Sequence, residues 1–154
     1  MKKLLIIFLV SITNISLAQS KFETETWISE KIKMYGEKSS DVENDYILTF
    51  KNGLIEVTHT TKINNRLYTI NAYITIKDIS SFQFTEEKDV ILLKIQTNDT
   101  SKVKSKLNFE DKYKLSDNYN FILNKSFKNN DLINRMTKAI NNLIKLNGGK
   151  KEAF

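Results

Sequence analysis

The sequence contains no cysteine and only one histidine, His59, in 154 residues. Without cysteine the chain forms no disulfide and offers no thiolate as a nucleophile or metal ligand. With a single histidine, zinc sites and serine–histidine catalysis also lack their parts. These absences exclude most of the common hydrolytic and metal-dependent chemistries.

Glycine and proline are scarce as well, with four glycines and no proline. A glycine-rich phosphate loop is excluded because the only adjacent glycines, Gly148 and Gly149, follow a predicted helix instead of opening one. The net charge of +6 falls to +4 without Lys2 and Lys3, and it is spread over the chain. We therefore expect a weak preference for anionic surfaces and no specific nucleic-acid partner.

The one long hydrophobic run lies at residues 4–10, directly after Lys2 and Lys3. Ser16 and Ala18 follow it as small residues at the −3 and −1 positions of a cleavage site, which is the pattern of a secretory signal peptide. The run is too short to span a membrane, and no cysteine follows the site to accept a lipid. We predict a signal peptide at 1–18 and a protein that is exported, periplasmic or secreted, without a lipid anchor.

Removal of residues 1–18 leaves a mature chain of 136 residues, 19–154, which suits a single domain. A secreted chain without disulfides depends on its hydrophobic core alone. This fits bacterial export better than the disulfide-rich small domains of animals. The mature chain contains no repeat and no linker, so we expect one domain.

The clearest helix is predicted at about 130–147, where apolar residues recur at spacings of three and four. These residues are Leu132, Met136, Ala139, Ile140 and Leu143. Asn129 or Asn130 is expected to cap its start and Gly148 its end. A shorter helix at about 22–36 is expected to rest on the core through Trp27, the only tryptophan. The C-terminal helix has so broad an apolar face that it is predicted to cover a β-sheet or barrel.

Two tight turns set the register of three predicted strands. A turn at Asn52-Gly53 pairs Phe50 with Ile55, Leu48 with Val57 and Tyr46 with His59. A turn at Asn64-Asn65 then pairs His59 with Ile70, Val57 with Ala72 and Ile55 with Ile74. Both turns place the same side chains on one face, so we predict one apolar surface across three antiparallel strands.

Four further strands are predicted, followed by the C-terminal helix. The strand at 90–97 is expected to be central and covered on both faces, because apolar residues occupy both of its sides. Residues 110–118 are predicted to form a polar loop. The seven predicted strands lie at about 46–50, 54–63, 67–76, 80–86, 90–97, 101–109 and 119–125.

The predicted order of elements gives an α+β, mostly β, fold. Seven antiparallel strands closed by a C-terminal helix resemble the pleckstrin-homology-like fold, which implies a bent sheet or open barrel with the helix at one end. The signal peptide, Trp27-Ile28 and the ending Leu146 to Lys151 with Phe154 are similar to short secreted proteins of the Bacteroidota group. Neither resemblance implies a catalytic residue. The short loop Lys51-Asn52-Gly53 also departs from the basic loop of phosphoinositide-binding members of that fold.

His59 shares the predicted apolar face with Val57, and we interpret it as a hydrogen-bonded packing residue. Glu56 lies on the opposite face of the same strand and cannot act with it. The acidic clusters at 86–89 and 110–111 fall in polar turns, where solvated charge is the ordinary interpretation.

A calcium loop is suggested by Asp41, Glu43 and Asp45, which alternate like its first three ligands. Tyr46 and Asn52 replace the glycine and the glutamate that such a loop needs. The sequence therefore predicts no metal, no cofactor and no enzymatic activity.

Lys102, Lys104 and Lys106 lie on one face of the strand predicted at 101–109 and form the candidate site. Such a row suits contact with lipopolysaccharide, anionic lipid or nucleic acid. Lysines on an edge strand also protect it from pairing with another chain. The sequence leaves both interpretations open.

We predict an exported, non-catalytic binding or scaffold module whose partner is a protein or peptide at the cell envelope, bound between a sheet edge and the C-terminal helix. One alternative is a carrier of a small apolar or lipid ligand inside the barrel, and another is a carboxylate-based envelope enzyme. A carrier requires an apolar cavity of roughly several hundred Å³, whereas a scaffold has a packed interior and an exposed patch. The oligomeric state is left open.

Overall fold

The computed structural model of the protein describes residues 21–39, 42–63 and 65–149. The predicted signal peptide at 1–18 and the ending from Lys150 to Phe154 lie outside these residues. A helix occupies described residues 21–35. The strands are β1 Val42–Lys51, β2 Leu54–Ile63, β3 Arg66–Thr75, β4 Ile79–Glu86, β5 Val90–Thr97, β6 Val103–Leu107, β7 Lys114–Ser116 and β8 Asn118–Asn124. The remaining helices are the 3-10 helices η1 Ile76–Asp78 and η2 Lys125–Asp131 and the α-helix α2 Leu132–Leu146.

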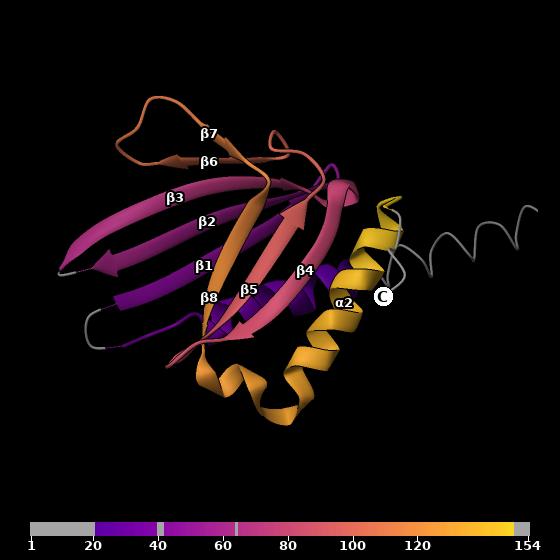
Figure 1. The fold of residues 1–154 in the computed structure, drawn as a ribbon, viewed down its shortest axis with the longest axis horizontal. Coiled ribbons are helices and arrows are strands. Elements are labelled where there is room, and N and C mark those ends of the chain that lie inside the picture. Colours follow the sequence, from indigo (N-terminus) through magenta and orange to yellow (C-terminus); the bar gives the residue numbers. More distant parts are fainter. Residues whose placement is uncertain (1–20, 40–41, 64, 150–154) are drawn as a thin grey trace, which may run out of the picture.

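The described strands form two antiparallel sheets (Figure 1), which confirms the α+β, mostly β, class with an N-terminal and a C-terminal helix. The five-stranded sheet has the order β1-β2-β3-β6-β7, and the three-stranded sheet has the order β4-β5-β8. The predicted count of seven strands, in a bent sheet or open barrel, is not confirmed, because the described residues form eight strands in two sheets. The extra strand, β7, lies inside the predicted loop 110–118, and its three residues are too few to show an alternating pattern.

Both hairpin registers are confirmed. Tyr46 lies opposite His59, Leu48 opposite Val57, and Ala72 opposite Val57 on its other side. At the first turn Asn52 has φ 52° and Gly53 has φ 75°, which are the two left-handed residues of a type I′ turn. The face shared by β1, β2 and β3 is buried and is called the inner face below.

The β1 edge is joined to the three-stranded sheet by residues 36–38. Gly36 forms a bridge with Leu123 of β8, and Lys38 forms one with Glu43 of β1. A Cβ atom on Gly36 would lie 2.3 Å from the carbonyl oxygen of Asn44, closer than any side chain can pack. Only glycine therefore permits this approach of the two sheets.

Strand β5 is central in its sheet, as predicted, but it is not covered on both faces. Ile91, Leu93 and Ile95 are buried on its inner side, whereas Lys94 on the other side is exposed. The apolar residues Val90 and Leu92 on that outer side are only half-buried. The long apolar run at 90–97 therefore reflects one core face and one partly solvated face.

Helix α2 begins at Leu132, two residues later than predicted. Asn129 has an extended backbone and Asn130 a left-handed one, so the chain turns sharply between η2 and α2. Asp131 is the N-cap residue, with φ 59° and no side-chain capping bond, which corrects the expectation of an asparagine cap. At the other end Gly148 has φ 77° and follows the helix as predicted.

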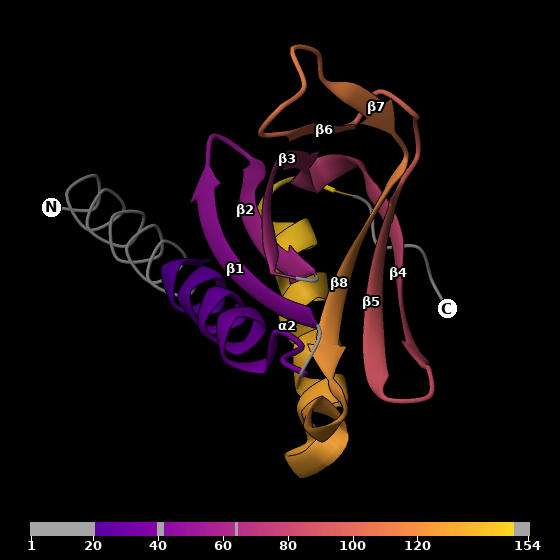
Figure 2. The ribbon, with the colours of Figure 1, turned by 90° about the vertical axis from the view of Figure 1, so that its left-hand side faces the viewer.

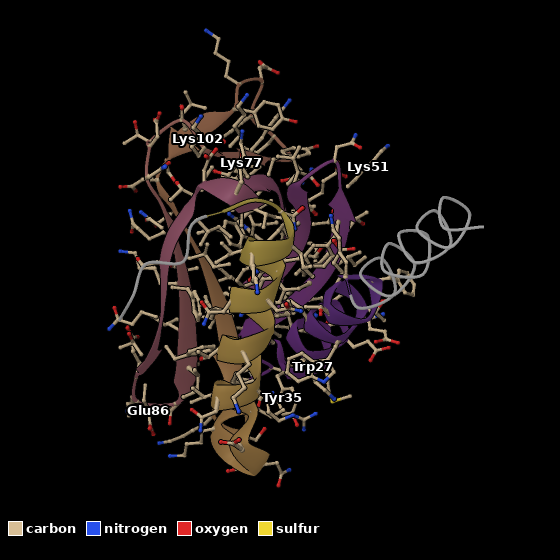
Figure 3. The ribbon with its side chains drawn as sticks, turned by 90° about the vertical axis from the view of Figure 1, so that its right-hand side faces the viewer. Trp27, Tyr35, Lys51, Lys77, Glu86 and Lys102 are labelled. Atoms are coloured by element: carbon tan, nitrogen blue, oxygen red, sulfur yellow. The ribbon has the colours of Figure 1, made fainter. Side chains whose placement is uncertain are left out.

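The two helices pack against a single core that both sheets share. Figure 2 shows the N-terminal helix beside β1 and α2 behind the sheets. The guanidinium of Arg135 in α2 lies 5.3 Å from the centre of the Trp27 ring, so Trp27 joins the two helices (Figure 3). An interior void of about 10 Å³ lies among Ile32, Phe121, Leu143 and their neighbours, which is room for no more than one water molecule.

Candidate functional site

The three predicted site lysines lie on or beside β6. Lys102 directly precedes the strand, and Lys104 and Lys106 point to the outer face of the five-stranded sheet. Tyr73 of β3 lies opposite Lys104, and Asn71 lies opposite Lys106. Because β6 pairs with β3 on one side and β7 on the other, it is not an edge strand. Protection of an edge therefore does not explain this row of lysines.

Aromatic and aliphatic side chains surround the lysines on the same face. The rings of Tyr73 and Tyr113 meet edge to face with their centres 5.9 Å apart. The Lys106 ammonium lies 5.8 Å from the centre of the Tyr113 ring. Leu115 of β7 lies opposite Lys104 and is 58% exposed, and Tyr113 is 48% exposed. We call this group the lysine–tyrosine face: Tyr73, Lys104, Lys106, Tyr113 and Leu115.

Only some of the lysines at and beside this face form ion pairs with carboxylates. Lys102 pairs with Asp78 at 3.7 Å and Lys114 with Glu110 at 2.6 Å. Lys104 and Lys106 form no ion pair with any residue in the described ranges. A hydrogen bond with the hydroxyl of Tyr113 raises the pKa of Tyr73, so Tyr73 stays neutral at physiological pH. The face thus combines two ammonium groups that lack an ion pair in the described ranges with two tyrosine rings and an exposed leucine.

Lys102 stands apart from the face. Figure 3 places it at the end of the molecule where Lys51 and Lys77 are also labelled, and its ammonium is held by Asp78. Of the three predicted lysines, the structure brings Lys104 and Lys106 together with the aromatic residues.

The opposite, inner face of the sheet carries a buried polar cluster. His59 is 6% exposed, its Nε2 lies 2.8 Å from Oδ1 of Asn44, and its ring stacks on Tyr46 at 4.4 Å. Burial lowers the pKa of His59 to about 4, so the ring is neutral at neutral pH. The predicted packing role of His59 is therefore confirmed. The Tyr46 hydroxyl accepts the Ile122 N–H at 2.9 Å and so links the two sheets.

Two donors of this region are unpartnered within the described part of the chain. They are Nδ2 of Asn44 and the hydroxyl of Tyr119. Burial raises the pKa of Tyr119 and also raises that of Tyr46, to about 12. Neither phenol can therefore ionise at physiological pH.

Several carboxylates of the described residues form ion pairs with lysines. Glu86 lies within 3.5 Å of Lys125 and 3.0 Å of Lys128, and these contacts lower its pKa. Lys38 bridges Glu43 and Asp45, while Asp41 of the calcium-like pattern lies outside the described residues. No group of three or more His, Cys, Asp or Glu that could hold a metal occurs in the ranges that the structure describes.

Two surface grooves flank the N-terminal helix. One, of about 390 Å³, lies against α2 and is lined by Trp27, Arg135 and Lys138 among others. The other, of about 340 Å³, lies against β1 between Phe22, Leu48 and Phe50. Both are shallow and border the N-terminal helix, whereas the sequence predicted a groove between a sheet edge and the C-terminal helix.

Comparison with protein-family models, with curated proteins and with solved structures returned no match for this chain. None of the helices in the described ranges has the length and hydrophobicity needed to cross a bilayer.

Sequence reasoning did not find Tyr73, Tyr113 and Leu115. Tyr73 lies off the apolar face of its strand, a signal that it points outward. Tyr113 and Leu115 fall in a segment predicted as a polar loop. Only the fold brings that segment beside Lys104 and Lys106.

Proposed function

We propose that this protein is an exported, non-catalytic binding module whose partner is an acidic segment of a protein or peptide at the cell envelope. The observation that carries the proposal is the lysine–tyrosine face, where Lys104 and Lys106 have no counter-charge among the described residues. An acidic segment would supply that charge, and Tyr113 and Leu115 would contribute apolar contact.

The build of the face supports binding in three ways. Its lysines and Tyr73 stand on strands paired on both sides, so the backbone is already ordered before a partner arrives. Tyrosine offers a large contact area at a small entropy cost and is enriched at protein interfaces. Exposed lysines at the rim accelerate encounter with an acidic partner and make binding sensitive to salt.

The interior of the protein gives less support to a ligand carrier. Its void of about 10 Å³ is far below the cavity that a lipid or drug-sized ligand requires. A carboxylate-based enzyme is likewise less well supported at the two acidic clusters, because contacts with lysine lower the pKa of Glu86 and of Glu110, whereas a general acid needs a raised pKa. Burial raises the pKa of Glu25, but that carboxylate is paired with Lys21 of its own helix.

The finer fold class stays part of this proposal. Bent antiparallel sheets and a C-terminal helix support a pleckstrin-homology-like relationship for residues 19–154. The chain crosses between its two sheets three times, after β3, β5 and β7. In this it differs from the predicted arrangement, in which successive strands are joined largely by hairpins. Export is also a prediction, and the N-terminal sequence of protein recovered from the envelope tests it, with Gln19 expected first.

Site-specific photocross-linking tests the proposed function. A photoreactive amino acid replaces Leu115, and in a matched control it replaces Ile47, which is 62% exposed on β1 of the same sheet. The envelope fraction of the exporting host is then irradiated with each variant. We expect one protein to be cross-linked at residue 115 and not at 47.

Charge reversal sharpens the test. Lys104→Glu with Lys106→Glu should abolish the cross-link at residue 115, whereas Lys51→Glu with Lys62→Glu, an equal charge change on β1 and β2, should leave it intact. Equal cross-linking at 47 and 115, or no effect of the first double variant, would contradict the proposal. Cross-linked lipid or polysaccharide would assign the face to anionic envelope material instead of a protein.

A further inference from the structure

The edges of the two sheets are protected to different degrees. Along β1, the Asn44 N–H donates to Glu37 at 2.7 Å, the Val42 carbonyl accepts from Ser39 at 2.7 Å, and the Leu48 carbonyl accepts from the Ser29 hydroxyl at 3.2 Å. Along β8, the Ile122 peptide group is bound by Tyr46 and Glu37. The third edge, β7, has only three residues. Short or covered edges of this kind prevent pairing with another chain.

Strand β4 is the exception. It has eight residues, Ile79–Glu86, with no lysine, arginine or proline to discourage pairing. Its register with β5 shifts between Ile79 and Ser81, so the regular part of the strand begins at Ser81. The Glu87 N–H donates to the Val90 carbonyl oxygen at 3.0 Å and closes the β4–β5 turn. Because peptide groups along an antiparallel strand point alternately toward and away from the neighbouring strand, this bond determines which residues of β4 are bonded to β5. The peptide groups of Phe82, Phe84 and Glu86 therefore point away from β5. No backbone hydrogen bond reaches them from any residue in the described ranges.

The sequence of β4 is complementary to itself when two copies run antiparallel. In a register centred on Gln83, Phe82 lies opposite the second copy's Phe84 and Ser81 opposite its Thr85. Ser80, at the register shift of β4, comes next to the second copy's Glu86 at the end of the paired segment. In β4 the peptide groups of the even-numbered residues point away from β5. In this register even-numbered residues of one copy lie opposite even-numbered residues of the other, so their peptide groups can form hydrogen bonds between the two copies.

The side chains favour this register over its neighbours. Phe82 and Phe84 are half-buried, meet each other edge to face at 6.5 Å, and would form two aromatic cross-strand pairs about the two-fold axis. No like charges lie opposite each other, and the charge of Glu86 is already balanced by Lys125 and Lys128 of its own chain. A register centred on Phe82 would place Asp78 of one copy opposite Glu86 of the other, which brings like charges together. A register centred on Phe84 would place Phe82 opposite Glu86, which pairs an aromatic ring with a carboxylate.

We propose that β4 is a homodimer interface, in which β4 of one molecule pairs antiparallel with β4 of a second copy about an axis at Gln83. Two three-stranded sheets join into one six-stranded sheet, with a closed two-fold contact that leaves neither β4 edge open. The lysine–tyrosine face belongs to the other sheet, so each dimer carries two copies of it and gains avidity for a partner with repeated acidic segments.

Disulfide trapping tests the register directly, because the natural chain has no cysteine. In Gln83→Cys the two introduced thiols face each other across the axis as a non-hydrogen-bonded pair, with Cα atoms about 4.5 Å apart, within the range that a disulfide spans. In the control Ser81→Cys, on the same strand and the same face, the thiols are several residues out of register. We expect mild oxidation to yield covalent dimers of the first variant and monomers of the second.

A backbone variant tests the hydrogen bonds. Glu86→Pro removes one outward N–H from each copy and leaves the ladder with β5 intact, whereas Glu86→Ala removes the same ion pairs but keeps the N–H. Sedimentation equilibrium of the processed, purified chain should show a dimer. Glu86→Pro should raise its dissociation constant about tenfold relative to Glu86→Ala.

A monomer at 100 µM protein, roughly the upper end of in-vitro concentrations, would overturn the proposal. So would a dimer in which Gln83→Cys does not cross-link while its circular dichroism matches the natural chain, since the dimer would then use another face. A monomer that retains an envelope peptide along β4, detected by protection of the Phe82 and Phe84 amides from exchange, would assign the edge to that partner instead.

Discussion

His59 and Lys104 belong to the same five-stranded sheet but lie on its opposite faces. His59 is buried, held by Asn44 and stacked on Tyr46, and its pKa is lowered by that burial. Lys104 is exposed and has no ion pair within the described ranges. Polar groups on the inner face are therefore part of what holds the two sheets together. We expect that polar groups on the outer face can be replaced without disturbing the fold, which is what a binding surface requires.

The largest expected effect comes from two adjacent residues of β3. Ile74→Ala removes a fully buried side chain from the inner face and should lower the free energy of unfolding by about 2–5 kcal/mol. Tyr73→Ala, one residue away on the outer face, should lower it by only about 0.2–1 kcal/mol. Urea denaturation of both variants measures the difference. Equal losses would show that the outer face is also structural.

Acidification from pH 7 to 5 should act chiefly on the inner face. His59 takes up a proton near pH 6.5 in the unfolded chain and near pH 4 in the folded one, so stability is complete above pH 6.5 and is lost as the pH falls toward 4. Between pH 7 and 5 this loss is about 2 kcal/mol. Urea midpoints at both pH values should show it in the natural chain. In His59→Gln the decrease in the free energy of unfolding between pH 7 and 5 should be smaller by about 2 kcal/mol. If the variant and the natural chain lost the same stability, His59 would be excluded as the source.

A smaller effect is expected where the inner face meets the second sheet. Tyr46→Phe keeps the ring that stacks on His59 but removes the hydroxyl that accepts the Ile122 N–H. The free energy of unfolding should fall by about 1–2 kcal/mol, because a half-buried donor loses its partner. Hydrogen exchange at the Ile122 amide should accelerate more than at Phe121, whose amide bonds to β5. Unchanged exchange at Ile122 would contradict this role.

The smallest effect on stability is expected from Lys104→Glu with Lys106→Glu on the outer face. Neither lysine has an ion pair among the described residues, so thermal melting should shift by an amount equivalent to less than about 0.5 kcal/mol. Binding to the acidic partner should nevertheless be lost. A large drop in melting temperature would mean that these lysines stabilise the sheet, and any loss of binding could not then be assigned to the face.

The inner face could be predicted from the sequence because its information is local. Asn52-Gly53 determines a turn, and a period of two then decides which side chain lies opposite which, so Tyr46 and His59 were paired correctly. The division into two sheets could not be predicted in this way. It depends on the bridge between Gly36 and Leu123 and on the hydrogen bond between Tyr46 and Ile122, which are contacts between segments far apart in the chain.

The outer face was predicted only in part for the same reason. The alternation of Lys104 and Lys106 is visible in the sequence, but Tyr113 comes from a segment with no periodic pattern. Whether the strand that carries the lysines lies at the edge or inside the sheet depends on β7. The three residues of β7 are too few to show an alternating pattern in the sequence. A long-range pairing thus decided how the local lysine pattern should be interpreted.

Residues 36–38 make folding depend on the order in which the chain is synthesised. This segment leaves the ribosome early, yet its partner in β8 is made much later, because Leu123 follows Gly36 by 123 − 36 = 87 residues. Folding that depends on such distant contacts is slow. The first part of the nascent chain therefore has no completed core to join until most of the protein has been made. We expect a protein organised in this way to stay unfolded for longer during translation than one built from contacts between neighbouring segments.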